Sequence, residues 1–177
     1  MDDHNDSDED TQVRSSSSSY DASVNEILPG LWLGDMSSAQ NQTFLSNKQI
    51  QFIIHCFNKT KEPQGSQGPQ GPQGPEIKYD VPLVDRYQTS DFPKVCQVLD
   101  GYCLLIKNHI NTHNILIYCH NGLDYAPLIV TMYLMKYGVM DLTEVIRGLA
   151  SKRPQTERIL IHYEHLLIFY QKNFLHV

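Results

Sequence analysis

Cys119 is the cysteine whose surroundings best suit a reactive thiol. It follows the short apolar run Ile115 to Ile117. That run is brief and β-branched, as in a buried strand. Gly122 marks a turn after the thiol, and Pro127 suits the first position of a helix. A strand, a tight loop and a helix N-terminus together aim backbone N–H groups at an anion, and they favour the thiolate form of a neighbouring cysteine. The stretch therefore predicts a nucleophilic thiol beside an anion-binding loop.

This stretch resembles the signature loop of the cysteine-based protein tyrosine phosphatases, whose pattern is Cys-x-x-Gly-x-x-Arg. The resemblance implies that Cys119 is the nucleophile, which attacks phosphorus to form a phosphocysteine that water then hydrolyses. It also implies that backbone N–H groups cradle the phosphate. The implied phosphate-binding loop consists of His120, Asn121, Gly122, Leu123, Asp124 and Tyr125.

The general acid of such a phosphatase is an aspartate that protonates the leaving oxygen. Asp85 ends the segment Val81-Pro-Leu-Val-Asp85, where members of the family place this residue. Asp91 is a weaker alternative. The resemblance therefore implies Cys119 and Asp85 as the catalytic pair.

Three residues depart from the family pattern, and each departure weakens phosphate binding. Tyr125 stands where the family has Arg, whose planar guanidinium gives phosphate a fixed fork of donors and a full charge. Tyr118 stands where the family usually has His before the cysteine. Asp124 adds a negative charge, which would repel phosphate if its carboxylate faced the loop. These departures predict a divergent, pseudophosphatase-like member with little or no activity.

The remaining cysteines and histidines suggest weaker chemistry. Cys56 is a candidate resolving cysteine, because some relatives form a reversible disulfide between this strand end and the nucleophile; a plain core cysteine is the simpler interpretation. His120 beside Cys119 is a weak candidate for a thiol–imidazole dyad, since adjacent loop residues seldom face one another. The His and Cys spacings match no common zinc pattern, so we expect no metal and no cofactor.

The order of elements predicts an α/β fold with a mostly parallel central sheet flanked by helices, and from about residue 25 to 172 it resembles the dual-specificity phosphatase fold. The opening segment, Pro29-Gly-Leu-Trp-Leu-Gly34, also resembles the start of such domains. A capping box of Asp141 and Glu144 predicts a helix that ends before Pro154. The other expected elements are a hairpin at 26–35, strands at 51–57, 77–84 and 115–117, and helices at 39–47, 92–110, 128–137 and 159–169.

Residues 1–24 are predicted to be a disordered acidic and serine-rich tail preceding a domain at 25–177. Residues 1–26 hold eight acidic side chains and one basic one, whereas the remaining chain holds twelve acids and thirteen bases. The overall charge of −6 therefore belongs to the tail. The tail is interpreted first as a solubilising segment, and alternatively as a phosphate acceptor for acid-directed kinases.

Residues 63–76 form a collagen-like Gly-Pro-Gln insert, with glycines at 65, 68, 71 and 74. About four triplets are too few for a triple helix, so an extended polyproline-II linker is expected. A tolerated loop expansion is the first interpretation. A binding arm at the rim of the site is the alternative.

Composition restricts the partners and the compartment. A near-neutral body lacks the basic stripe that nucleic-acid binding needs, and no apolar run reaches the roughly 18–20 residues of a membrane span. The acidic N-terminus is unlike a secretory signal, and four cysteines without paired spacing indicate a reducing compartment. We therefore expect a cytoplasmic or nuclear location and no contact with nucleic acid or membrane. The sequence does not predict the oligomeric state.

Three functions remain open from the sequence. The first is a pseudophosphatase that binds a protein partner, such as a kinase or another phosphoprotein. The second is a weakly active tyrosine or dual-specificity phosphatase that uses Cys119 and Asp85. The third is a structural or assembly protein in which the insert and the tail are the working parts.

Overall fold

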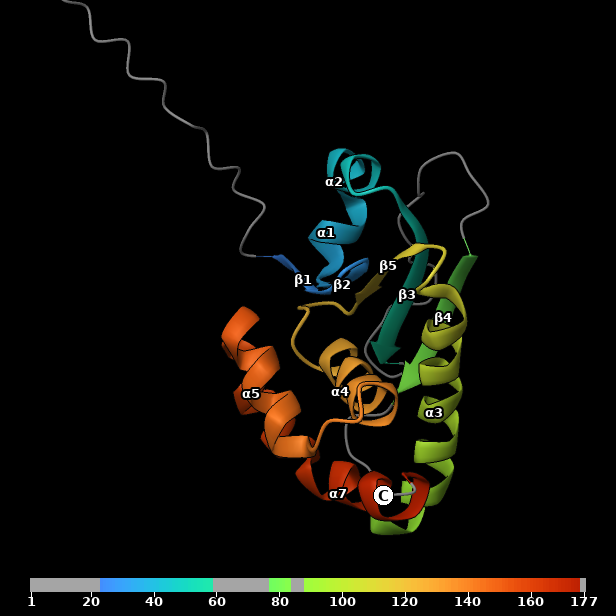
Figure 1. Cartoon of the computed structure of the whole chain (residues 1–177), viewed down its shortest axis with the longest axis vertical. Helices are drawn as coiled ribbons and strands as arrows, with labels where there is room; N and C mark the ends of the chain where they lie inside the picture. Colours follow the sequence, from blue (N-terminus) through green and yellow to red (C-terminus); the bar gives the residue numbers. More distant parts are fainter. Residues whose placement is uncertain (1–22, 59–76, 84–87, 176–177) are drawn as a thin grey trace, which may run out of the picture.

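A five-stranded sheet forms the centre of the molecule, with its strands in the order β1-β2-β5-β3-β4 (Figure 1). The computed structural model describes residues 23–58, 77–83 and 88–175. Only β1 and β2 pair antiparallel, and the other neighbouring strands are parallel. The predicted mostly parallel α/β sheet is thus confirmed. The strands are β1 (Val24–Leu28), β2 (Leu31–Gly34), β3 (Ile50–Asn58), β4 (Ile77–Leu83) and β5 (Asn114–Tyr118).

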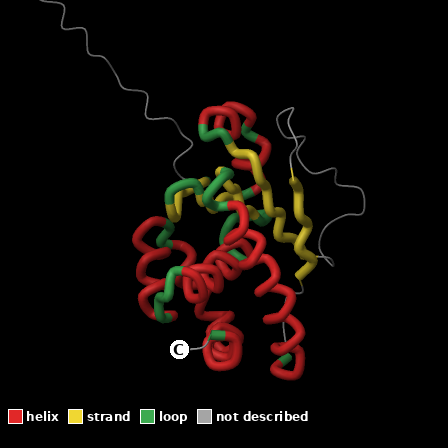
Figure 2. The backbone as a smooth tube through the Cα atoms, turned by 45° about the vertical axis from the view of Figure 1, so that its right-hand side comes forward, coloured by secondary structure: helices red, strands yellow, loops and turns green. Residues whose placement is uncertain are grey.

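Helices cover both faces of the sheet, and most of them lie on one face (Figures 1 and 2). The short helices α1 (Met36–Gln40) and α2 (Gln42–Asn47) pack on one side. The other side carries α3 (Phe92–His109), α4 (Tyr125–Tyr137), α5 (Leu142–Lys152), α6 (Gln155–Leu160) and α7 (Glu164–Phe174). Short 3₁₀ turns at Thr89–Asp91 and Ile161–Tyr163 precede α3 and α7.

The central strand β5 separates two hydrophobic clusters. Ile115 and Ile117 point to the larger cluster under α3 and α4, and Cys119 beyond the strand points the same way. Leu116 and Tyr118 point to the smaller cluster under α1 and α2. This alternation follows from the two-residue period of a strand. It places Cys119 on the face that α4 covers.

Several predicted elements match the structure. The hairpin turns at Pro29-Gly30, where Gly30 has a φ of +78°. The capping box before α5 is present, since the Glu144 N–H donates to Asp141 Oδ1 and the Asp141 N–H donates to Glu144 Oε2. Helix α5 ends at Lys152, just before Arg153 and Pro154.

Two predicted helices are wrong in their extent. The helix expected at 39–47 is two helices, because Asn41 interrupts it and its side chain accepts the N–H of Phe44 at 3.0 Å, starting α2 anew. The helix expected at 159–169 begins earlier, at Gln155, and a 3₁₀ turn splits it into α6 and α7. Local capping outweighs apolar periodicity in the first case.

The start of α4 also differs from the prediction. The helix begins at Tyr125, so Pro127 lies in its third position instead of its first. The first-turn N–H groups have no partner within a helix, and a proline is therefore tolerated anywhere in that turn. At the other end, Gly138 caps the helix and keeps a right-handed helical backbone. The next residue, Val139, takes the left-handed conformation with a φ of +52°.

Both segments that the sequence marked as unusual fall outside the described part of the chain. The acidic tail at 1–24 is described only from Ser23 onward, where β1 soon begins, and the insert at 63–76 is not described. The tail and the insert stay predictions. Over the described residues, no helix has both the length and the apolarity to cross a membrane.

Candidate active site

The thiol of Cys119 lies at the carboxyl end of β5 with only 1% of the residue exposed. The backbone N–H groups of Asp124, Tyr125 and Ala126 lie near its sulfur and favour the thiolate. The predicted geometry of strand, loop and helix N-terminus is therefore present. In this respect the loop has the donors that anion binding requires.

The N–H groups at the helix N-terminus lower the pKa of Cys119, as predicted, but burial outweighs their effect. Burial raises the pKa of this thiol above its ordinary value, despite the backbone N–H donors. The carboxylate of Asp124 raises it further by charge repulsion. The sequence showed the donors, but it could not show how completely the sulfur is buried.

Gly122 is the residue on which the turn of the loop depends. It has a φ of +68°, which favours glycine, and a Cβ at this position would lie 2.5 Å from Arg153 Nη2 and 2.8 Å from the Gly34 carbonyl oxygen. Both conformation and space therefore require glycine. The predicted role of Gly122 as the turn residue agrees with this geometry.

A buried arginine, Arg153, supports the loop from behind. Its Nε donates to the Gly122 carbonyl oxygen at 3.1 Å, and its Nη1 donates to the Ser23 carbonyl oxygen at 3.2 Å and to Asn25 Oδ1 at 2.8 Å. Arg153 is 4% exposed. One guanidinium thus joins the loop to the start of β1, although 31 residues separate Arg153 from Gly122 along the chain.

The charge of Arg153 acts on the site as well as on the fold. Burial lowers its pKa, whereas the attraction of Asp35 and of Cys119 opposes that change; the group stays protonated, as arginines in proteins do. Burial also opposes ionisation of Asp35, but hydrogen bonds from the Ser37 hydroxyl and the Ser38 N–H lower the pKa of this carboxyl. Behind the loop there is consequently a buried positive charge beside an ionised aspartate.

Sequence reasoning missed Arg153. It noted that a helix ends before Pro154, but it gave the preceding arginine no role. No spacing links Arg153 to the loop, because the contact arises only when α5 packs beside β1. The one available signal was a charged residue between a helix and a proline, which is common at surfaces.

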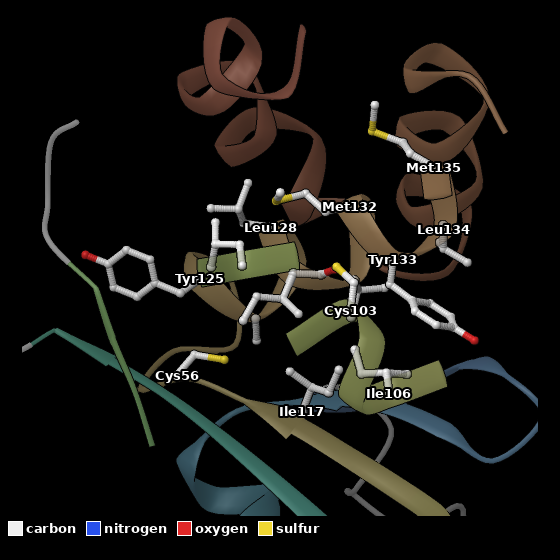
Figure 3. Packing of buried hydrophobic residues seen from close by; sticks show 14 of the residues in the cluster. Cys56, Cys103, Ile106, Ile117, Tyr125, Leu128, Met132, Tyr133, Leu134 and Met135 are labelled. Atoms are coloured by element: carbon white, nitrogen blue, oxygen red, sulfur yellow. The ribbon is translucent and has the colours of Figure 1, made fainter. Parts of the chain in front are cut away.

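Tyr125, at the position where the family has arginine, lies in the core. The residue is 6% exposed and belongs to the larger hydrophobic cluster. Its ring lies 6.4 Å from that of Tyr163, and Figure 3 shows it at the edge of that cluster, with its hydroxyl pointing away from the other labelled side chains. The first turn of α4 therefore presents an aromatic ring to the core and carries no cation.

The polar residues at the opening of the loop bind one another. Asn121 Oδ1 accepts the N–H of Leu123 at 2.9 Å and lies 3.6 Å from the Cys119 sulfur. Asn121 Nδ2 donates to Asp124 Oδ2 at 3.0 Å. His120 is exposed, and its carbonyl oxygen accepts the N–H of Met36 at 3.3 Å.

Tyr118 lies on the opposite face of the sheet from Cys119. Its ring is fully buried in the smaller cluster and stacks on His55, with 4.6 Å between the ring centroids and 9° between the planes. Its burial there makes it a packing residue beneath α1 and α2. This departure from the family pattern therefore contributes to packing on the face away from Cys119.

Cys56 lies next to Cys119 in the sheet. Its neighbour His55 pairs with Tyr118 across β3 and β5, and both cysteines face the larger cluster. Both thiols are free. Burial raises the pKa of Cys56 well above its ordinary value, and Cys119 raises it further. A disulfide between them stays a prediction.

The predicted general acid lies outside the described residues, because the structure does not describe 84–87. The alternative, Asp91, is exposed at the start of α3, where its Oδ2 accepts the N–H of Gln88 at 3.2 Å. Asp85 stays a prediction. Within the described ranges, no three His, Cys, Asp or Glu side chains are grouped to hold a metal ion.

Comparisons with known proteins identify relatives of this chain. The model of the dual specificity phosphatase catalytic domain matches residues 31–173. Human dual specificity protein phosphatase 18 is 26% identical over 166 residues, which cover 87% of this chain and 78% of that protein. MAP kinase phosphatase with leucine-rich repeats protein 3 of Dictyostelium discoideum is 26% identical over 132 residues, which cover 75% of this chain but only 14% of that longer protein.

Solved structures share the fold at low identity. Human DUSP28 superposes with a TM-score of 0.69 and 20% identity, covering 85% of this chain and 94% of that one. Human tyrosine phosphatase-like serine/threonine/tyrosine-interacting protein has a TM-score of 0.59 and 20% identity, covering 86% of this chain and 98% of that one. At this identity the likeness shows the fold alone.

Proposed function

This chain belongs to the dual specificity phosphatase family, and on that premise we propose that it is a pseudophosphatase. In this proposal the loop at 119–125 binds a protein partner, such as a kinase or another phosphoprotein, with little or no turnover. Because a protein partner of this kind meets the protein inside the cell, we include a cytoplasmic or nuclear location in the proposal.

The observation that carries the proposal is the placement of Tyr125. Its ring is 6% exposed and packs in the core beside Tyr163, at the position where the family has its phosphate-gripping arginine. By analogy with buried ion pairs, losing such a charge-assisted contact costs roughly 2–5 kcal/mol. At about 1.4 kcal/mol per decade, this is a loss of ~30- to several-thousand-fold in phosphate binding.

Arg153 is already engaged in holding the fold. Its Nε donates to the Gly122 carbonyl oxygen, and its Nη1 donates to the Ser23 carbonyl oxygen and to Asn25 Oδ1. The guanidinium is also buried, and its charge is attracted by both Asp35 and Cys119. In the proposal its first role is therefore to support the loop.

A weakly active phosphatase is the second candidate, and the N–H groups that face Cys119 favour it. In that mechanism the Cys119 thiolate would form an S–P bond while the P–O bond to the substrate breaks, and Asp85 would give its proton to the leaving oxygen. Water would then break the S–P bond and release phosphate. The raised pKa of Cys119 opposes the first step, because the thiolate is the nucleophile.

One assay separates the two candidates. The wild-type chain is offered an aryl phosphate and phosphotyrosine peptides beside Cys119→Ser, with phosphate release as the readout. The pseudophosphatase proposal predicts equal release by both proteins. Release by the wild type that disappears in Cys119→Ser would overturn the proposal and favour the phosphatase.

Binding is tested separately, with a phosphotyrosine peptide and its unphosphorylated counterpart. A ligand in the loop shields Cys119, so the phosphorylated peptide should slow alkylation of Cys119 by iodoacetamide, measured by mass spectrometry. The unphosphorylated peptide is the control. Equal alkylation with both peptides would contradict recognition of a phosphorylated partner by this loop.

A further inference from the structure

The Asn121 side chain bridges three groups at the opening of the loop. Its Oδ1 accepts the Leu123 N–H at 2.9 Å and lies within hydrogen-bond distance of the Cys119 thiol, at 3.6 Å. Its Nδ2 donates to Asp124 Oδ2 at 3.0 Å. These contacts place a carboxamide oxygen beside the sulfur and on a backbone donor of the same loop.

An oxyanion in this loop would need the same kind of donor. Backbone N–H groups of such a loop hold an anion through its oxygen lone pairs, and a carboxamide oxygen offers two lone pairs of the same kind. The Leu123 N–H is already used by Asn121 Oδ1. A ligand that takes this donor must therefore displace the side chain.

We propose that Asn121 is an internal ligand of the loop, whose carboxamide oxygen occupies a donor site that an incoming oxyanion must take over. This inference rests on the proposed function, in which the loop binds a phosphorylated partner. It adds that the unliganded loop is closed by its own side chain. Asn121 is thus a residue that sets the affinity of the loop for oxyanions, independently of the loss of arginine at 125.

The contact between Asn121 Oδ1 and the Cys119 sulfur also affects the ionisation of the thiol. A carboxamide oxygen only accepts hydrogen bonds, so its contact with Cys119 requires the protonated thiol as donor. A thiolate in the same place would be repelled by the oxygen. Asn121 therefore favours the neutral thiol, and its removal should make Cys119 more reactive.

Asp124 holds the closed arrangement from the other side. Its carboxylate accepts from Asn121 Nδ2 and repels negative charge at Cys119. Displacement of Asn121 leaves this carboxylate without that donor. An incoming anion then meets an unshielded negative charge, which also favours the closed loop.

The experiment measures alkylation of Cys119 by iodoacetamide at about pH 8, below the ordinary pKa of a free thiol, in the full chain. The variants are Asn121→Ala, which removes the oxygen, and Asn121→Asp, which keeps an acceptor on Leu123 and adds a charge. Asn173→Ala is the matched control, because Asn173 lies at an exposed position of α7 and donates to the Phe169 carbonyl oxygen. We expect roughly three- to tenfold faster alkylation for Asn121→Ala, slower alkylation for Asn121→Asp, and no change for Asn173→Ala.

Inorganic phosphate is the probe that tests whether Asn121 competes with an oxyanion for the loop. The concentration that halves alkylation of Cys119 should fall roughly tenfold in Asn121→Ala, because one donor is released, and should rise in Asn121→Asp. A fall in Asn121→Ala with no change in Asn173→Ala supports an internal ligand. An unchanged or higher concentration in Asn121→Ala would overturn it, since the released Leu123 N–H would then add nothing to phosphate binding.

The alkylation experiment and the turnover assay can fail separately. Turnover by the wild type would contradict the pseudophosphatase, whatever the alkylation rates of the Asn121 variants. Unchanged alkylation rates would contradict the internal ligand, whatever the turnover of the wild type.

Discussion

The two sides of the loop at 119–125 differ in charge and in partners. The back of the loop, formed by Gly34, Gly122 and Arg153, holds a buried guanidinium that donates to backbone oxygens. The mouth, formed by Asn121, Asp124 and Tyr125, holds one negative charge, one amide and one buried ring. Positive charge thus remains where it holds the fold and is missing where it would hold a ligand.

This difference follows from what each side does for the folded state. A change at the back leaves buried carbonyl groups unpaired or makes backbone atoms collide, and both are costly. A change at Asn121 or Asp124 in the mouth alters a ligand contact and leaves the packing of the sheet intact. The family fold can therefore persist while phosphate binding is lost. Variants at the back should change the free energy of unfolding most, and variants at the mouth should change ligand binding or thiol reactivity.

The largest effect is expected for Gly122→Ala at the back of the loop. The new Cβ would lie 2.5 Å from Arg153 Nη2 and 2.8 Å from the Gly34 oxygen, at a φ of +68°. We expect the free energy of unfolding to fall by about 3 kcal/mol, measured by urea denaturation. Gly101→Ala in α3 is the control, because nothing lies within 4 Å of its new Cβ; it should raise stability by roughly 0.5–1 kcal/mol.

The next largest effect is expected for Arg153→Met, which keeps the bulk of the side chain and removes its three hydrogen bonds. We expect a loss of about 2–3 kcal/mol in the free energy of unfolding, because the Gly122 and Ser23 carbonyl oxygens lose their donor. Arg147→Met, at an exposed position of α5, should change it by less than about 0.5 kcal/mol. Equal stability of the two variants would contradict a supporting role for Arg153.

Tyr125→Arg tests the mouth, and we expect a smaller loss of about 1–2 kcal/mol. The guanidinium cannot stay where the ring packs beside Tyr163, so the core loses that packing. Inorganic phosphate should raise the melting temperature of this variant more than that of the wild type, because the variant adds a cation at the position where the family has one. A phosphate effect equal to that on the wild type would show that the loop cannot use an arginine at 125.

The smallest effect is expected for Asp124→Asn. The Asp124 carboxylate raises the pKa of Cys119 by repulsion, so its neutralisation should lower that pKa. Below the pKa the rate follows the thiolate fraction, and alkylation of Cys119 at about pH 8 should rise roughly two- to fivefold. Glu157→Gln, at an exposed position on α6, should leave the rate unchanged; a rate that stays constant in both would remove Asp124 from the site.

The sequence predicted the parts of the site that local patterns encode. Strand β5, the turn at Gly122 and the capping box of α5 each leave a signal within a few residues. The parallel sheet followed from the order of elements. These predictions succeeded because periodicity and turn residues act over short distances.

Other features depend on contacts between distant segments and left no such signal. Arg153 reaches Gly122 only because α5 packs beside β1. The pKa of Cys119 depends on how deeply the sulfur is buried, and this depth follows from the packing of α4 on β5. The missing cation at 125 was visible in the sequence, whereas the burial of the tyrosine that replaces it was not.

The most direct test of the central claim, an intact loop with a neutral thiol, is the pH dependence of Cys119 alkylation in the wild type. Burial raises the pKa of this thiol above its ordinary value, so the group stays protonated to a higher pH than a free thiol does. We predict a rate that rises through a midpoint above about pH 8.5, the ordinary value for a thiol. A midpoint below about pH 7, typical of an activated cysteine, would contradict the account.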